Sequence, residues 1–431
     1  MSQSWLFEKA WLPGGWQDRV LVEADQGVIR SVTPQAGDVP SSALRPAGYA
    51  LPALVNVHSH AFQRAFAGLS EYRTSGRDSF WTWRELMYRF LETLTPEDVY
   101  RIGLRLYGEM RAAGYSQVGE FHYLLHQPGG TPYSHINEMA DALIRAATES
   151  GIGICMLPVL YQRGGFDDAV LQGGQLRFGS STDLYLNMLE RLRDDWRDQP
   201  GVTIGVALHS LRAVSLEAAG EVLQAVDRIL PGCPVHVHVA EQTAEVDDCV
   251  AATGKRPVRL LLDSLDVNSR WCLIHATHMT DDECRDVAAR GAVVGVCPTT
   301  EANLGDGIFA ARRFLDAGGR LAVGSDSHIA INPWEELRLL EYGQRLSGRS
   351  RAVLCRDDDS CGNLLYQWTG QGGCQATGQA IFGLQPGGAA RLLLVDPGRF
   401  FQAIPDPRIL DYLVFQSSLG LNGSTAAPFP D

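Results

Sequence analysis

The chain has 431 residues, of which 45% are hydrophobic and 20% charged, a composition typical of a globular protein with a large core. Its formal net charge is −13 and it has no run of basic residues, which argues against nucleic acid as a partner. Nine cysteines without a CxxC pair indicate reduced thiols rather than a disulfide framework or a cysteine-based zinc site. Without a transmembrane stretch or a signal-peptide pattern, we expect a cytoplasmic protein with no membrane partner.

The first 50 residues predict a small β unit, because short strand patterns alternate there with turn residues. The strand patterns are "SWLFEKAWL" and "DRVLVEADQGVIRSVTP", which are separated by "PGG". After about residue 376 the chain returns to short strands and turns, as in "IFGLQPGGAARLLLVD". We therefore expect residues 1–50 and 376–431 to form one small β-sandwich domain that ends in a loose tail over residues 417–431.

Between these two segments, over residues 51–375, short apolar strands alternate with helical patterns. The expected strands are 51–60, 115–123, 151–161, 202–210, 233–241, 270–278, 291–300 and 319–328. Helical patterns include 136–150, 215–230 and 280–291, the last with Thr280 as N-cap and Gly291 at its end. Eight such units predict a (β/α)8 TIM-type barrel. A doubly wound fold would need a glycine-rich turn after the first strand, and "VNVHSHAF" is not one.

Residues with metal-binding or acid–base chemistry follow several of these strands, at the end where barrels have their active sites. They are His58 and His60 after the first strand, His209 after the fourth, His238 and Glu241 after the fifth, His275 after the sixth and Asp326 after the eighth. Because residues i and i+2 of a strand point the same way, His58 and His60 can face one ion. Neutral imidazoles with one carboxylate suit zinc or another borderline divalent cation.

Each of these residues also has a purely structural interpretation. A lone HxH pair is a weak signal, and the second one, His236 and His238, requires a choice: we expect His236 in the core. Asp326 could simply cap the helix that follows it. The remaining histidines are expected in loops or behind the ligands: His122, His126, His135, His278 and His328. The coincidence of so many such residues with strand ends favours a metal site.

Four short motifs, "HSH", "HVAE", "HATH" and "GSD", resemble those of the amidohydrolase superfamily in its deaminase branch. Longer strings resemble the formimidoylglutamate deiminase (N-formimino-L-glutamate iminohydrolase) family within that branch. They are "NVHSHAFQRAFAGLSEYR", "SFWTWRELMYRF", "GEFHYLLH", "TEANLGDGIF" and "GSDSHIAINPWEELRLLEYGQRL". The resemblance extends over almost the whole chain. It implies zinc-dependent hydrolysis of N-formimino-L-glutamate to N-formyl-L-glutamate and ammonia, in histidine degradation.

The resemblance also implies roles for individual residues. One divalent metal ion, Zn²⁺, would be held by His58, His60, His238 and Asp326. Glu241 would be the proton shuttle, His275 a catalytic residue beside the metal, and Asp326 would also accept a proton from water. The substrate contacts would be Gln63, Arg84, Tyr123, His209 and Arg212. Two arginines suit a dicarboxylate substrate, which they can bind against the negative net charge of the chain.

Other features limit or extend this expectation. Binuclear amidohydrolases often bridge two metals with a lysine after the fourth strand, and neither Lys9 nor Lys255 lies there, so we expect one metal. Arg391 stands where an aspartate is common, and residues 356–379 and those after Leu410 fit the family pattern poorly.

A homodimer is a family-level expectation. The alternatives are another deaminase of the superfamily, acting on a purine, pyrimidine or S-adenosyl-type substrate, and a non-catalytic binding protein.

Overall fold

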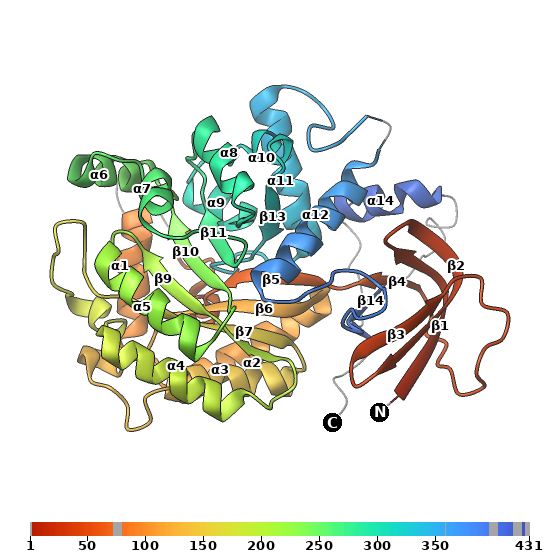
Figure 1. Cartoon of the computed structure of the whole chain (residues 1–431), viewed down its shortest axis with the longest axis horizontal. Helices are drawn as coiled ribbons and strands as arrows, with labels where there is room; N and C mark the ends of the chain where they lie inside the picture. The colour runs from red at the N-terminus through yellow and green to blue at the C-terminus, as the bar shows by residue number, and fades with distance from the viewer. Residues whose placement is uncertain (1, 72–79, 358, 396–403, 417–424, 427–431) are drawn as a thin grey trace.

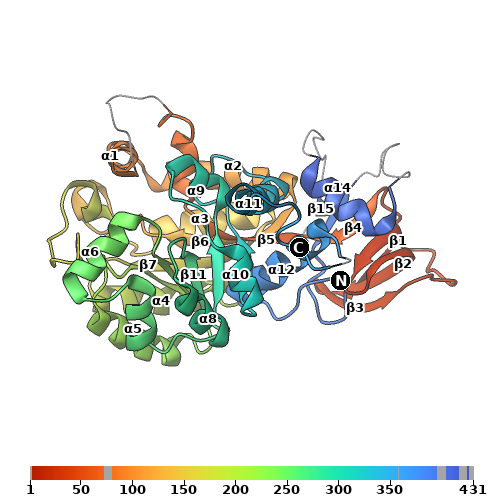
Figure 2. The ribbon, with the colours of Figure 1, turned by 90° about the horizontal axis from the view of Figure 1, so that it is seen from above.

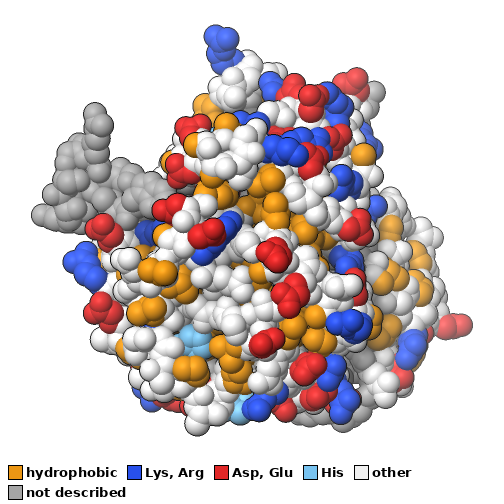
Figure 3. All heavy atoms as spheres, turned by 60° about the vertical axis from the view of Figure 1, so that its left-hand side comes forward, with side chains coloured by type: hydrophobic (Ala, Val, Ile, Leu, Met, Phe, Trp, Pro, Cys, Tyr) orange, Lys and Arg blue, Asp and Glu red, His pale blue; other side chains and the backbone are white. Residues whose placement is uncertain are grey.

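The computed structural model describes residues 2–71, 80–357, 359–395, 404–416 and 425–426 (Figure 1). In this part of the chain the strands form two sheets, a nearly closed parallel barrel and a six-stranded sheet beside it. On the face shown in Figure 3, Lys and Arg side chains are interspersed with Asp and Glu. None of the described helices is long and apolar enough to cross a membrane.

The barrel confirms the predicted (β/α)8 fold class. Its strands are β5 (Leu54–Ser59), β6 (Tyr115–His122), β7 (Gly153–Leu160), β9 (Val206–Ser210), β10 (Val235–Val239), β11 (Trp271–His275), β12 (Val293–Val296) and β13 (Arg320–Val323). Neighbouring strands in this order pair in parallel. A parallel bridge between Ser59 and Asp326 then joins the first strand to the segment after the last. Residues at the carboxyl ends of all these strands therefore meet at one mouth.

Helices surround the barrel in Figures 1 and 2. They are α1 (Phe80–Leu91), α2 (Pro96–Ala113), α3 (Glu138–Ser150), α4 (Thr182–Trp196), α5 (Leu216–Ile229), α6 (Thr243–Thr253), α7 (Pro257–Ser264), α8 (Asp281–Ala289), α9 (Pro298–Leu304), α10 (Ala311–Asp316), α11 (Pro333–Gly348), α12 (Cys361–Ala376) and α14 (Ile409–Phe415). Short 3-10 turns include η1 (Ala61–Phe66), directly after the first barrel strand, and η3 (Gly173–Arg177). Both turns bring residues to the mouth of the barrel.

The second sheet combines strands from both ends of the chain, as Figure 2 shows at the side of the barrel. Its order is β15 (Thr425–Ala426), β14 (Leu392–Val395), β4 (Tyr49–Pro52), β1 (Ser2–Leu12), β2 (Gly15–Asp25) and β3 (Val28–Thr33). Its buried face includes Trp5, Phe7, Val22 and Leu392. Residues 417–424 and 427–431 of the predicted tail lie outside the described residues, and the expected domain limits remain predictions.

Three predicted strands differ from the structure in more than their end residues. Residues 298–300, expected at the end of the seventh strand, begin helix α9 instead. Leu51 and Pro52, expected in the first barrel strand, belong to β4 instead, because Leu393 and Leu392 of β14 pair with them. The predicted strand 202–210 is divided into β8 (Val202–Ile204) and β9 at Gly205, where a Cβ atom would lie 2.9 Å from the Pro234 carbonyl oxygen. The hydrophobic pattern alone shows neither break, since it runs through both.

The poorly matching C-terminal features have clear places in the fold. Residues 361–376 form α12, which packs against β13 and β5 and so covers the seam where the barrel closes. Gly372 lies directly against the backbone of Leu321, leaving no room for a side chain. Arg391 bonds the Gln117 side chain at the start of β6, and burial lowers the pKa of its guanidinium to about 10. Arg391 therefore connects the second sheet to the barrel.

Thr280 caps α8 as the sequence predicts. Its hydroxyl accepts from the Glu283 N–H, and the Glu283 carboxylate accepts from the Thr280 N–H at 2.8 Å, a reciprocal capping box. We expect Thr280→Ala to lower the free energy of unfolding by about 1 kcal/mol, measured by urea denaturation. Thr93→Ala is the control, because it removes an exposed hydroxyl that contacts the Phe90 carbonyl oxygen at 3.5 Å and caps no helix N-terminus. Equal effects of the two substitutions would contradict a capping contribution.

Candidate metal centre and active site

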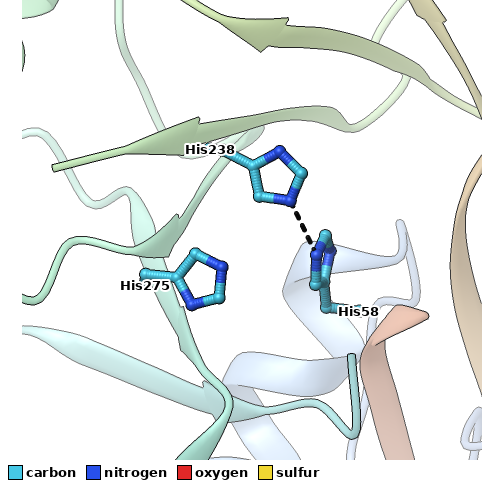
Figure 4. A group of neighbouring side chains, drawn as sticks. All are labelled: His58, His238 and His275. Atoms are coloured by element: carbon cyan, nitrogen blue, oxygen red, sulfur yellow. Dashed lines mark hydrogen bonds between the residues drawn. The ribbon is translucent and has the colours of Figure 1, made fainter. Parts of the chain in front are cut away.

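Three histidines and an aspartate converge at the mouth of the barrel, and all four side chains are buried. His58 Nε2 lies 2.9 Å from His238 Nε2 and 3.5 Å from Asp326 Oδ1. His60 Nε2 lies 3.2 Å from the same carboxylate oxygen. Figure 4 shows the His58 and His238 rings pointing toward each other, with His275 beside them. Residues at the ends of the first and fifth barrel strands, and in the segment after the eighth, thus form one histidine–aspartate cluster.

The hydrogen bonds behind two of these rings determine which nitrogen faces the cluster. His60 Nδ1 is 2.9 Å from the Phe121 carbonyl oxygen, and His238 Nδ1 is 3.0 Å from the His209 carbonyl oxygen. Because a carbonyl oxygen only accepts, each Nδ1 carries the proton and each Nε2 presents a lone pair. Two lone pairs therefore face the same small region as the Asp326 carboxylate.

The surroundings of the cluster determine the protonation states of its side chains. Burial, helped by the nearby His60, lowers the pKa of His58 to about 3, and burial holds the pKa of His238 well below its usual range. Burial opposes ionisation of Asp326, but the His58 and His60 side chains beside it still hold the pKa of its carboxyl well below the usual range. Near pH 7 the imidazoles of His58 and His238 are neutral and the carboxyl of Asp326 is ionised, which is the form in which each binds a metal.

His275 forms a second group with acidic residues next to the first. Its Nδ1 is 3.2 Å from Glu301 Oε1, and its Nε2 is 3.8 Å from both Glu241 Oε1 and Asp326 Oδ2. Burial lowers the pKa of His275, but Glu241 and Glu301 outweigh it and raise the pKa to about 10. Burial raises the pKa of Glu241 to about 7. A cation therefore lies beside a carboxyl group that titrates near neutrality.

The backbone at this mouth is strained. His275, Ala276, Asp326 and His328 have φ values between 46° and 65°, a left-handed region that residues with side chains seldom adopt. Strained backbone of this kind is common at functional sites, and it persists only where the surrounding structure restrains it. The parallel bridge between Ser59 and Asp326 is one such restraint.

A pocket opens onto the cluster and contains the predicted substrate contacts. Its lining includes His60, Gln63, Arg84, Tyr123, His209, Arg212, His238, Glu241, His275 and Asp326. Gln63 Nε2 donates to the Tyr123 hydroxyl at 2.8 Å, and Gln63 Oε1 has no hydrogen-bond partner among the described residues. Arg84 Nε donates to the Tyr88 hydroxyl at 2.5 Å. The structure thus brings together every site residue that the sequence predicts, with His58 behind the lining, while their individual roles remain predictions.

The comparisons with known proteins agree with this geometry. The sequence model of the amidohydrolase family matches residues 49–417. The chain belongs to the amidohydrolase family.

As an amidohydrolase, the chain is a hydrolase, and it has close relatives. It is 47% identical to the formimidoylglutamate deiminase of Pseudomonas aeruginosa over 391 residues, which are 90% of this chain and 85% of that protein. It is 26% identical over 356 residues to a 5-methylthioadenosine/S-adenosylhomocysteine deaminase of Natronomonas pharaonis, covering 80% of this chain and 72% of that one.

Solved structures show the same fold. The crystal structure of an amidohydrolase from Brucella melitensis superposes with a TM-score of 0.91 at 44% identity, covering 96% of this chain and 91% of that one. A zinc-bound adenosine deaminase from Xanthomonas campestris has a TM-score of 0.79 at 23% identity, covering 96% and 88%. The second likeness shows only that the two chains share a fold.

The amidohydrolase has residues at its site that sequence reasoning did not select. Glu120 accepts from the Ser59 hydroxyl at 2.5 Å and from the Ala61 N–H at 2.7 Å, so it holds the turn that carries both histidines of the HSH motif. Glu301 anchors His275, and Asp306 accepts from Gln242 beside Glu241. The motifs "GEFHY" and "TEANLGDGIF" contain these acids, but their spacing to the histidines is visible only in the fold.

His236 and His328 lie where the sequence predicts, whereas His122 is a buried residue at the end of strand β6. His236 is buried, with its Nε2 2.7 Å from the Ala376 carbonyl oxygen, so it belongs to the core rather than to the mouth. Burial lowers the pKa of His236 to about 4. His328 is also buried and contacts the hydroxyls of Ser59 and Ser325 behind the cluster. Neither His236 nor His328 lines the pocket.

Proposed function

We propose that this amidohydrolase is a zinc-dependent formimidoylglutamate deiminase, which hydrolyses the carbon–nitrogen bond of the formimino group and releases ammonia in histidine degradation. The observation that carries the proposal is the presence of Arg84 and Arg212 in the same pocket as the histidine–aspartate cluster. Arginine binds carboxylates through two parallel hydrogen bonds, so this pocket suits a dianion with a hydrolysable group near the cluster. Purine and pyrimidine substrates carry no such charge.

The donor set fits one divalent ion of the zinc type. His58, His60, His238 and Asp326 would hold it, with neutral imidazole nitrogens and an ionised carboxylate. When bound, such an ion acts as a Lewis acid and makes a water molecule more acidic. The hydrogen bonds that His60 and His238 donate through Nδ1 to the Phe121 and His209 carbonyl oxygens keep their Nε2 atoms oriented for this purpose.

The residues of the chain would divide the proton chemistry among themselves. Asp326 is ionised and accepts a proton from water. Glu241, with a pKa raised by burial to about 7, can hold a proton and deliver it to the departing nitrogen. His275, kept positive by Glu241 and Glu301, stabilises negative charge that develops on the tetrahedral carbon's oxygen. Glu301 keeps the His275 ring in place through Nδ1.

Ammonia release tests this proposal directly. The purified, zinc-loaded protein should release ammonia from N-formimino-L-glutamate and not from guanine, cytosine or S-adenosylhomocysteine. Release only from one of the heterocyclic compounds would reject the substrate assignment. It would not contradict the fold or the proposed metal-binding role of the histidine–aspartate cluster. Release from none would favour a binding protein without turnover.

Arg212→Ala is expected to raise KM for N-formimino-L-glutamate by about 30-fold or more while kcat changes little, because losing one partner of a buried charged pair costs several kcal/mol of binding. Initial rates over a range of substrate concentrations measure this. Arg105→Ala, which removes an exposed arginine paired with Glu109, is the control. An unchanged KM in the Arg212 variant would remove this residue from the substrate contacts.

A further inference from the structure

Tyr161 is a pocket residue to which the sequence assigns no role. It follows β7 and is 1% exposed, and its ring lies edge-on to His209 at 4.6 Å between centroids. The His209 ring in turn lies 5.2 Å from the ring of His238, a member of the histidine–aspartate cluster. Tyr161 therefore lines the pocket one ring further from the cluster than His209.

The hydroxyl of Tyr161 is surrounded by hydrogen-bond donors. Arg84 Nη2 is 3.4 Å and Gln175 Nε2 is 3.2 Å from this oxygen, and Arg212 also interacts with it through its side chain. The orientation of the Gln175 amide follows from its other end, because Gln175 Oε1 accepts the backbone N–H of Gln172 at 3.2 Å. Three side chains from three different elements thus direct N–H groups at one oxygen.

This arrangement leaves the proton of the phenol without an acceptor. A tyrosine hydroxyl accepts up to two hydrogen bonds and donates one. Arginine has no acceptor atom, and Gln175 presents its donor nitrogen to Tyr161 because its Oε1 faces the Gln172 N–H. No hydrogen bond donated by Tyr161 occurs in the part of the chain that the structure describes. A buried donor without a partner is costly, so an acceptor from outside the chain is expected to complete it.

We propose that Tyr161 donates this hydrogen bond to the side-chain carboxylate of the substrate and, by accepting from Arg84 and Arg212, holds both guanidinium groups around that carboxylate. Tyr161 is then a specificity-determining residue for a dianion. The proposal rests on the proposed function, since it assigns one carboxylate of that substrate to a site distant from the metal cluster. A substrate carboxylate supplies the acceptor that the Tyr161 hydroxyl lacks.

Tyr161→Phe tests the proposal, because it removes only the hydroxyl. We expect KM for N-formimino-L-glutamate to rise about 10- to 100-fold, as for losing a hydrogen bond to a charged group, with kcat within about twofold. For N-formimino-L-2-aminobutyrate, which lacks the side-chain carboxylate, kcat/KM should be the same in both proteins. The control is Tyr185→Phe, which removes a buried hydroxyl that donates to the Pro158 carbonyl oxygen of β7 and lies outside the pocket lining. An unchanged KM, or equal losses with both substrates, would overturn the assignment.

A binding measurement separates this inference from the proposed function. If the wild-type protein releases no ammonia from N-formimino-L-glutamate, the proposed function fails. Calorimetric titration of the zinc-loaded protein with glutarate still tests Tyr161 in that case. Weaker glutarate binding by Tyr161→Phe than by wild type and Tyr185→Phe supports the carboxylate contact, and equal binding by all three, or no binding to wild type, rejects it.

Discussion

Glu241→Gln should lower kcat for N-formimino-L-glutamate by about 10²- to 10⁴-fold, the usual contribution of a positioned general acid or base. Glutamine has nearly the shape of glutamate but neither takes up nor releases a proton near neutral pH. Glu241 Oε1 is 3.8 Å from His275 Nε2, and burial raises the pKa of Glu241 to about 7, so the native side chain can change its protonation state during turnover. Steady-state ammonia release measures the effect.

Substrate binding should survive this substitution. The expected contacts with the carboxylates come from Arg84 and Arg212, which Glu241→Gln leaves in place, so the Kd for N-formyl-L-glutamate should change less than about threefold. Glu97→Gln, which alters an exposed carboxylate paired with Arg101, is the matched control. Near-normal turnover in the Glu241 variant would show that another group moves the proton.

The second large effect is expected from His60→Ala. The wild-type protein should contain about one divalent ion per chain, and loss of one of four ligands should remove most of it, with activity falling by about 10³-fold or more. His60 Nε2 is 3.2 Å from Asp326 Oδ1, so the substitution also removes a neighbour of the carboxylate. Elemental analysis after dialysis measures the metal independently of activity.

Thermal denaturation gives a further readout for the same variant. An ion that binds only the folded chain raises the melting temperature, so adding zinc to metal-free protein should stabilise the wild type and have little effect on His60→Ala. His135→Ala, whose ring is bonded to Asp141 away from the cluster, should behave as the wild type. Full metal content in His60→Ala would mean that the ion is held elsewhere.

Local sequence pattern was sufficient to predict much of the fold and the residues that meet at the mouth of the barrel. Apolar runs that end in polar residues predict the barrel strands, and the i, i+2 spacing of His58 and His60 puts both side chains on one side of a strand end. The capping box at Thr280 is equally local, since its two hydrogen bonds join residues three apart. These features depend on interactions between residues close in the chain, which is why the sequence displays them. The longer sequence motifs around the site also indicate the family by their resemblance to it.

Contacts between segments that are far apart in the sequence determined the rest of the fold and of the site. Leu51 and Pro52 pair with β14 rather than continuing into the barrel, because a strand near the C-terminus provides the partner. Closure of the barrel brings Glu301 to His275 and gathers donors from α1, η3 and the segment after β9 around Tyr161. The sequence by itself determined which residue types stand at the strand ends. Only the tertiary structure decided which of them share a hydrogen bond or a charge, because that depends on the distance between side chains after the barrel closes.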